Sequence, residues 1–145
     1  FTTLIIINLK KIEMKETKQE ILNRLFVENN LTEEDYFKHN KGFYTIITRS
    51  GIEKIMYNNN IEISYELLYN SPDNKCVIIK AKGKMGDKLI ETFGEASPNN
   101  NQNSYPVAIA EKRSMSRCVL KLTQLYQHQV FGEDEADAFK RSNNQ

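Results

Sequence analysis

The most regular pattern in the chain is an alternation of apolar and polar residues from Ile61 to Tyr69. Its odd-numbered positions are apolar or aromatic, and Glu62, Ser64 and Glu66 lie between them. A period of two residues is typical of a strand whose two faces meet different surroundings. We therefore expect a strand over Ile61–Tyr69, with one face turned toward the core.

Two further strands are predicted directly after this one, over Cys76–Lys84 and Leu89–Gly94. Turn residues separate the strands, with Ser-Pro-Asp-Asn at 71–74 and Met-Gly-Asp-Lys at 85–88. Short connections join antiparallel neighbours, so the sequence predicts a three-stranded antiparallel meander. In its second strand, three lysines share the face opposite Val77, Ile79 and Ala81; they are Lys80, Lys82 and Lys84.

A long helix is predicted after the polar loop 96–104, running to about Tyr126. We expect Ser104 to cap this helix and Pro106 to lie in its first turn. At 3.6 residues per turn, its apolar residues gather on one side, namely Val107, Cys118, Leu122 and Leu125. That side is expected to pack against the sheet.

The N-terminal half predicts shorter elements. A helix is expected over Lys15–Asn29, and a second, short helix is expected to begin at Thr32, with acidic residues in its first turn. Phe43–Thr48 has the β-branched and aromatic composition of a strand. A further helix, capped by Ser50, is expected to follow it. The fold class is therefore α+β, with the three-stranded meander packed against the long helix and with N-terminal helices.

The charge balance limits how the chain could bind nucleic acid. It has 145 residues with 20 Lys and Arg against 19 Asp and Glu, a formal net charge of +1. The protein is not basic overall, so affinity for a polyanion requires cations gathered on one face. A length of this order predicts one domain.

We place that single domain at residues 14–128. Residues 1–13 are interpreted as a leader or an artefact because Met14 is a plausible start, and residues 129–145 as an acidic C-terminal tail. The apolar run Leu4–Ile7 is too short to span a bilayer and lacks the flanks of a signal peptide. We expect no membrane association and a cytoplasmic protein.

The candidate binding residues are cations at regular spacing on the helix and on the second strand. Arg113, Arg117 and Lys121 recur every four residues and form one helical stripe with a rise of about 6 Å per step, whereas Lys112 projects elsewhere. The strand lysines recur at about 6–7 Å. Both spacings are similar to that of phosphates in an extended single strand. If helix and sheet flank one groove, the two rows would line it.

Aromatic residues near these rows are candidates for stacking on bases, namely Tyr44, Tyr65 and Tyr105. The alternative is that the tyrosines pack in the core and that the lysine row is an ordinary solvated sheet face. The helical stripe favours binding, because like charges four residues apart repel each other and a polyanion would relieve that repulsion.

Catalytic and metal-binding patterns are missing from the sequence. It contains no nucleophile elbow, no phosphate-binding P-loop and no zinc-protease motif, so we expect no enzyme and no cofactor. Cys76 and Cys118 have the apolar surroundings of buried reduced thiols, and the two histidines lie far from them in sequence, so no metal site is predicted. The acidic run 133–137 is interpreted as a solvated tail or a partner-binding segment.

The chain resembles the Rad fifty-two family of single-strand annealing proteins, including their phage relatives. The resemblance covers Phe43–Tyr126. It rests on the order helix, three-stranded meander, long basic helix, and on two segments, G-E-A-S-P at Gly94–Pro98 and Y-P-V-A-I-A-E-K-R-S-M-S-R-C-V-L-K-L at Tyr105–Leu122. The Asn-rich loop Asn99–Asn103 and the near-zero net charge depart from the family pattern.

The resemblance implies a β-β-β-α core that assembles into rings or filaments. Single-stranded DNA would lie in a basic groove, and complementary strands would anneal without nucleotide hydrolysis, as in recombination and repair. The residues that would contact phosphates are Lys80, Lys82, Lys84, Lys112, Arg113, Arg117, Lys121 and Arg49. The acidic tail would bind a replication or recombination partner. The alternative is a structural or adaptor protein without a nucleic-acid role, in which the basic stripe and the acidic tail pair between subunits.

Overall fold

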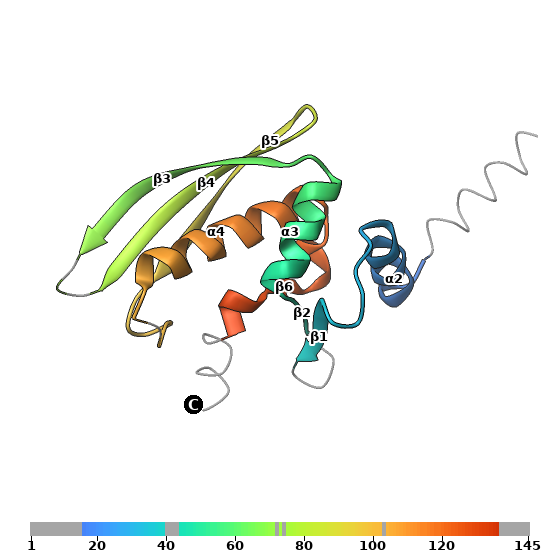
Figure 1. Cartoon of the computed structure of the whole chain (residues 1–145), viewed down its shortest axis with the longest axis horizontal. Coiled ribbons are helices and arrows are strands. Elements are labelled where there is room, and N and C mark those ends of the chain that lie inside the picture. The colour runs from blue at the N-terminus through green and yellow to red at the C-terminus, as the bar shows by residue number, and fades with distance from the viewer. Residues whose placement is uncertain (1–15, 40–43, 72, 74, 103, 137–145) are drawn as a thin grey trace, which may run out of the picture.

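Two three-stranded sheets lie on opposite sides of one long helix, α4 (Pro106–Leu122), as Figure 1 shows. The structure is a computed structural model that describes residues 16–39, 44–71, 73, 75–102 and 104–136. The larger sheet has the order β3-β4-β5 and the smaller one the order β1-β2-β6. The α+β class is confirmed.

The larger sheet is the predicted meander. It consists of β3 (Glu62–Ser71), β4 (Cys76–Met85) and β5 (Lys88–Ala96), each antiparallel to the next. A register shift between Leu67 and Tyr69 interrupts β3. Such a bulge reverses the side-chain alternation beyond it. Tyr69 is paired with Ile78, on the face opposite Tyr65, so our expectation that the two tyrosines share a face was wrong.

Close contact between α4 and the meander depends on glycine. A Cβ at Gly94 of β5 would lie 2.1 Å from the carbonyl oxygen of Ala110, and a Cβ at Gly83 of β4 would lie 2.1 Å from the Cys118 sulfur. The helix therefore packs with its backbone almost against β5. It begins at Pro106 with Tyr105 as N-cap, not Ser104, and it ends at Leu122, one turn earlier than expected.

The N-terminal part confirms the first predicted helix but not the second. The helix α2 (Lys18–Glu28) begins with a capping box between Thr17 and Glu20. Near Thr32 no helix forms, because the Asp35 carboxylate accepts the Thr32 amide at 2.8 Å and closes a turn instead. The strand β1 (Tyr36–His39) follows that turn.

The smaller sheet joins segments that are far apart in the sequence. β2 (Tyr44–Ile47) pairs antiparallel with β1 and in parallel with β6 (Val130–Gly132). The helix α3 (Arg49–Asn58) follows β2 and is capped by Thr48, whose hydroxyl accepts the Gly51 amide at 3.1 Å; Ser50, the predicted cap, lies within the helix. Two short 3₁₀ helices, η1 (Tyr126–His128) and η2 (Glu133–Glu135), flank β6.

The acidic C-terminal segment therefore does not begin as a solvated tail. From residue 130 to residue 135 it forms β6 and η2, and Asp134 and Glu135 are buried. The predicted remainder of the tail, from residue 137, lies outside the described residues, as do residues 1–15.

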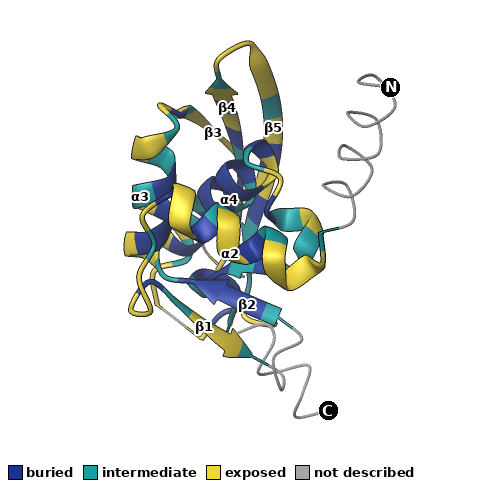
Figure 2. Ribbon diagram, turned by 90° about the vertical axis from the view of Figure 1, so that its right-hand side faces the viewer, coloured by how far each residue is buried: buried dark blue, intermediate teal, exposed yellow. Residues whose placement is uncertain are grey.

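Burial is concentrated on α4 (Figure 2), because sheets and helices cover it on several sides. Ten of its residues are buried, and three of these are polar or charged: Arg113, Ser114 and Ser116. Val107, which we expected in the core, is exposed at the N-terminal end. None of the helices in the described part of the chain is both long and apolar enough to cross a bilayer.

Candidate nucleic-acid interface

Three of the predicted cations converge on one short segment, η2. Arg49 is the first residue of α3, and Arg113 and Arg117 lie one turn apart on α4. All three contact residues of Glu133–Glu135. The fold thus gathers guanidinium groups from two helices, and we call these three residues the arginine cluster.

Arg113 is the buried member of the cluster. Only 1% of the residue is exposed, and its donors are directed at backbone and amide oxygens. Its Nε donates to the Asp134 carbonyl at 2.8 Å, Nη1 to the Glu95 carbonyl at 2.9 Å and Nη2 to the Asn100 carbonyl at 2.7 Å. Arg113 therefore ties α4 to β5, to the loop after β5 and to η2. In this structure it offers no surface to a phosphate, contrary to its predicted role.

Arg117 is held between two carboxylates. Its Nε donates to Glu135 at 2.7 Å, and its two terminal nitrogens lie 2.9 and 3.0 Å from the oxygens of Glu95. Its side chain is 19% exposed. Burial lowers and the two carboxylates raise the pKa of Arg117, and the net direction is upward, so the guanidinium stays charged.

Arg49 is the most accessible member, with a side chain that is 52% exposed. Its Nε donates to the Asp134 carboxylate at 2.9 Å, and its backbone amide, at the start of α3, donates to Glu133 at 2.7 Å. The hydrogen bond to Asp134 raises the pKa of Arg49. Asp134 thereby connects Arg49, through its carboxylate, and Arg113, through its carbonyl.

The cluster also covers an open sheet edge. β5 is the outer strand of the meander, so its outward carbonyls have no strand partner in the part of the chain that the structure describes. Arg113 donates to the carbonyl of Glu95, and Arg117 donates to that of Phe93 at 2.7 Å. Some of the hydrogen-bond donors of the cluster therefore satisfy carbonyls at this edge.

The strand lysines lie on the other side of the meander. Val77, Ile79 and Ala81 are buried toward α4, so the alternating Lys80, Lys82 and Lys84 point away from it. The predicted groove lined by both rows is therefore not present within one chain, because the sheet itself separates helix from lysines.

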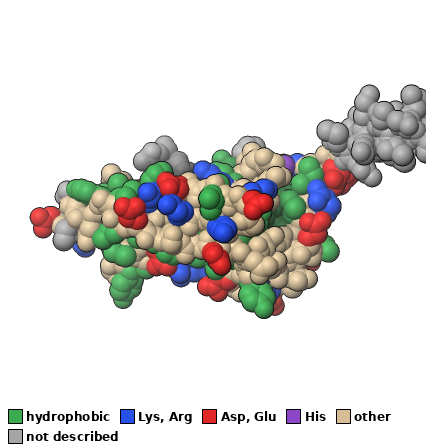
Figure 3. All heavy atoms as spheres, turned by 90° about the horizontal axis from the view of Figure 1, so that it is seen from above, with side chains coloured by type: hydrophobic (Ala, Val, Ile, Leu, Met, Phe, Trp, Pro, Cys, Tyr) green, Lys and Arg blue, Asp and Glu red, His purple; other side chains and the backbone are tan. Residues whose placement is uncertain are grey.

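Carboxylates partly neutralise the lysine row. Lys80 lies 3.1 Å from Glu66 and 3.7 Å from Glu91, and Lys82 lies 3.8 Å from Glu91. The hydrogen bond that Lys80 donates to the Glu66 carboxylate raises the pKa of Lys80. Basic and acidic side chains are interspersed over the face seen in Figure 3.

The remaining cations of α4 are closer to solvent. Lys112 is partly exposed and lies 3.6 Å from Glu111. Lys121 is exposed, with its ammonium group 5.1 Å from the centre of the Tyr126 ring. Lys121 is thus the predicted stripe residue that stays available at the surface.

The candidate tyrosines do not form one stacking surface. Tyr44 packs edge-on against Phe131, with ring centres 5.4 Å apart. Tyr65 lies on the α4 side of β3, where burial raises its pKa to about 12. Tyr105 is 69% exposed at the start of α4. Each tyrosine therefore lies in a different part of the molecule.

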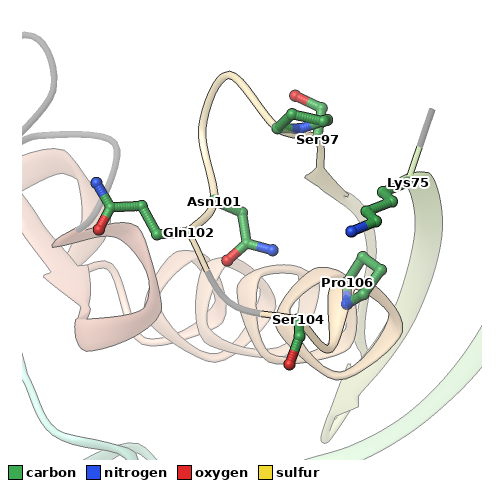
Figure 4. Close-up of a pocket in the computed structure, with 7 residues that line it drawn as sticks. Lys75, Ser97, Asn101, Gln102, Ser104 and Pro106 are labelled. Atoms are coloured by element: carbon green, nitrogen blue, oxygen red, sulfur yellow. The ribbon is translucent and has the colours of Figure 1, made fainter.

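A surface pocket of about 330 Å³ lies where the loop after β5 passes the first turn of α4 (Figure 4). Lys75 is its one cationic lining residue, beside Ser97, Asn101 and Pro106. The described residues contain no group of three or more Asp, Glu, His or Cys side chains placed to hold a metal ion.

Sequence analysis missed Glu95 as a partner of the arginine cluster, and it paired the acidic residues Glu133, Asp134 and Glu135 with the basic stripe only between subunits, in the adaptor alternative. The acidic run at 133–135 was visible, but its position depends on the pairing of β6 with β2. Among these partners Glu135 is unusual, because burial raises its pKa and its Oε2 atom is buried without a hydrogen bond within the described structure.

No protein-family model matches the chain, and no curated protein matches it.

Proposed function

We propose that the chain binds single-stranded DNA through its phosphates and anneals complementary strands, acting in the cytoplasm without catalysis or a cofactor. The observation that supports this most is the convergence of Arg49, Arg113 and Arg117 on one site, since the sequence singled out Arg49 separately from the helical stripe that holds the other two. Guanidinium groups bind phosphate oxygens with two parallel hydrogen bonds. A cluster from two helices offers such contacts in a fixed arrangement.

The three arginines take different roles in this proposal. Arg49, whose side chain is half exposed, and Arg117 would contact phosphates, whereas buried Arg113 positions α4 and η2. Lys121 lies one turn beyond Arg117 on α4 and would extend the contact along the strand. Such contacts carry no sequence information, as annealing of any complementary pair requires.

Self-association into a ring or filament is part of the proposal. At the opposite edge of the meander, β3 has no strand partner on its outer side within the described residues, and it exposes Tyr65, Leu67, Leu68 and Tyr69 at 42–55%. Exposed apolar residues on an open edge favour contact with another chain. Many copies along one strand would add their weak individual affinities.

The test is fluorescence anisotropy with a labelled oligonucleotide at several salt concentrations. We expect Arg49→Gln to weaken binding and to reduce the salt dependence by about 0.7 in slope, the value for one phosphate contact on a single strand. The matched control is Arg24→Gln, which removes the same charge from α2, where Arg24 pairs with Glu16 and Glu28. Equal affinities of these two variants, or no binding by the wild type at low salt, would contradict the proposal.

The alternative, a structural or adaptor protein, rested on pairing of the basic stripe with the acidic tail between subunits. Within the described residues, Arg117 pairs with Glu135 of its own chain at 2.7 Å, so that pairing needs no second subunit. Light-scattering mass with and without oligonucleotide separates the two functions. An oligomer that dissociates in high salt and ignores DNA would favour the adaptor.

A further inference from the structure

The arginine cluster is covered by carboxylates that take the positions phosphates would need. Glu133 and Asp134 accept from Arg49, and Glu135 accepts from Arg117, so three successive residues of η2 each contact the cluster. Glu95 adds a fourth carboxylate from β5. A polyanion that binds the Nε or the terminal nitrogens of Arg117 must displace one of these carboxylates, whereas the half-exposed Arg49 can still be approached from solvent.

Among the four, Glu135 is the carboxylate that is both buried and only partly hydrogen-bonded, which makes it the candidate to exchange. Only 6% of the residue is exposed, and one of its carboxylate oxygens accepts no hydrogen bond in the described structure. A buried, half-satisfied carboxylate is costly to keep charged. Its partner Arg117 would keep Glu95, which contacts both terminal nitrogens, if Glu135 turned away.

We infer that η2 is an internal competitor for nucleic acid: its carboxylates occupy the arginine cluster in the unbound chain and exchange with phosphates when a strand binds. This inference rests on the proposed function and assigns the regulation of the same site. The exchange involves side chains, whereas the bond from Arg113 to the Asp134 carbonyl and the β6 pairing hold the backbone in place. Binding is thereby weakened for a ligand with few phosphates and kept for one with many.

The direct test is the affinity of Glu135→Gln for a labelled oligothymidine at low salt. The amide keeps the shape of the side chain and removes the competing charge, so we expect binding to tighten by roughly tenfold, the size of one charge-assisted pair. The matched control is Glu53→Gln, which removes the same charge from the exposed surface of α3, where Glu53 makes no ion pair within the described residues. The control should bind like the wild type.

Three outcomes contradict the inference. Equal tightening by both variants means that only net charge matters. Weaker binding of Glu135→Gln means that Glu135 positions Arg117 for the phosphate and does not compete with it. Unchanged binding means that the strand does not use Arg117. If the wild type does not bind oligothymidine at all, the proposed function itself fails. Failure of the proposed function can therefore be told apart from failure of the inference about η2.

A second measurement does not depend on the stability of the variant. The Nε–H signals of Arg49 and Arg117 in an NMR spectrum of the wild type report their hydrogen-bond partners. Titration with oligothymidine should shift both signals, while the Nε–H signal of Arg113, bonded to a backbone carbonyl, stays in place. A shift of none of the three contradicts the exchange. Glu95→Gln provides another variant at Arg117 should Glu135→Gln unfold.

Discussion

Replacing Arg113 by methionine should test whether this residue supports the fold. Methionine has a similar length and fills most of the space, but it has no donors. The change removes the donors to three backbone carbonyls, those of Asp134, Glu95 and Asn100, and to the side-chain oxygen of Asn100. All three lie where α4, β5 and η2 meet, so water does not readily replace the guanidinium.

The expected cost follows from these bonds. A buried acceptor that loses its partner costs about 1–3 kcal/mol. Three such acceptors would cost roughly 3–6 kcal/mol once the gain from not burying a charge is subtracted. Small domains have stabilities of about 5–15 kcal/mol, so the variant should be marginally folded.

The assay is urea denaturation followed by circular dichroism. Arg113→Met should lower the midpoint strongly. The control Lys112→Met removes the same charge from a partly exposed neighbour on α4 and should change the free energy of unfolding by less than about 0.5 kcal/mol. If the two variants unfold at the same urea concentration, Arg113 is not structural, and the reasoning from its burial is wrong. Charge reversal at Arg113 is unsuitable as a test of binding, because the loss of this buried side chain should itself destabilise the fold.

Two further predictions concern the contact of α4 with the meander. Gly94→Ala places a Cβ 2.5 Å from the Ser114 backbone nitrogen, so the helix must move away from the sheet. The thermal midpoint of this variant should fall well below that of the control, Gly86→Ala. At Gly86 a Cβ meets open space, so the control loses only about 1–2 kcal/mol of stability through its positive φ. A midpoint equal to that of Gly86→Ala would show that α4 can move away from the meander with little loss of stability. A thiol reagent should modify half-buried Cys76 first and Cys118 only on unfolding, because burial both shields the Cys118 thiol and raises its pKa; fast modification of both at neutral pH would contradict this.

The parts of the fold that local pattern determines could be predicted from the sequence. The alternation of apolar and polar residues predicted the meander, and the 3.6-residue spacing of apolar residues predicted α4. Both patterns come from residues that are close together in the sequence and pack on one face of a single element. The bulge in β3 and the short strand β1 could not be predicted, since each depends on a hydrogen bond or register that neighbouring residues do not determine.

The character of the candidate site was harder to predict. A helical wheel places Arg113 beside an apolar face and suggests an exposed stripe. In the structure α4 is covered on more than one side, because β6 brings the C-terminal segment back beside β2. The acidic run then meets the arginines. Charge spacing along a helix thus identified Arg113 and Arg117, but neither their convergence with Arg49 nor the carboxylates that neutralise them.

The parallel pairing of β6 with β2 determines the order in which parts of the chain can fold. Arg49 and Asp134, which meet there, are 85 positions apart, so the meander and α4 must be made before the N-terminal strands acquire their last neighbour. Contacts of such long range slow folding and come late during synthesis. Until residue 132 leaves the ribosome, the edge of β2 that pairs with β6 has no strand beside it.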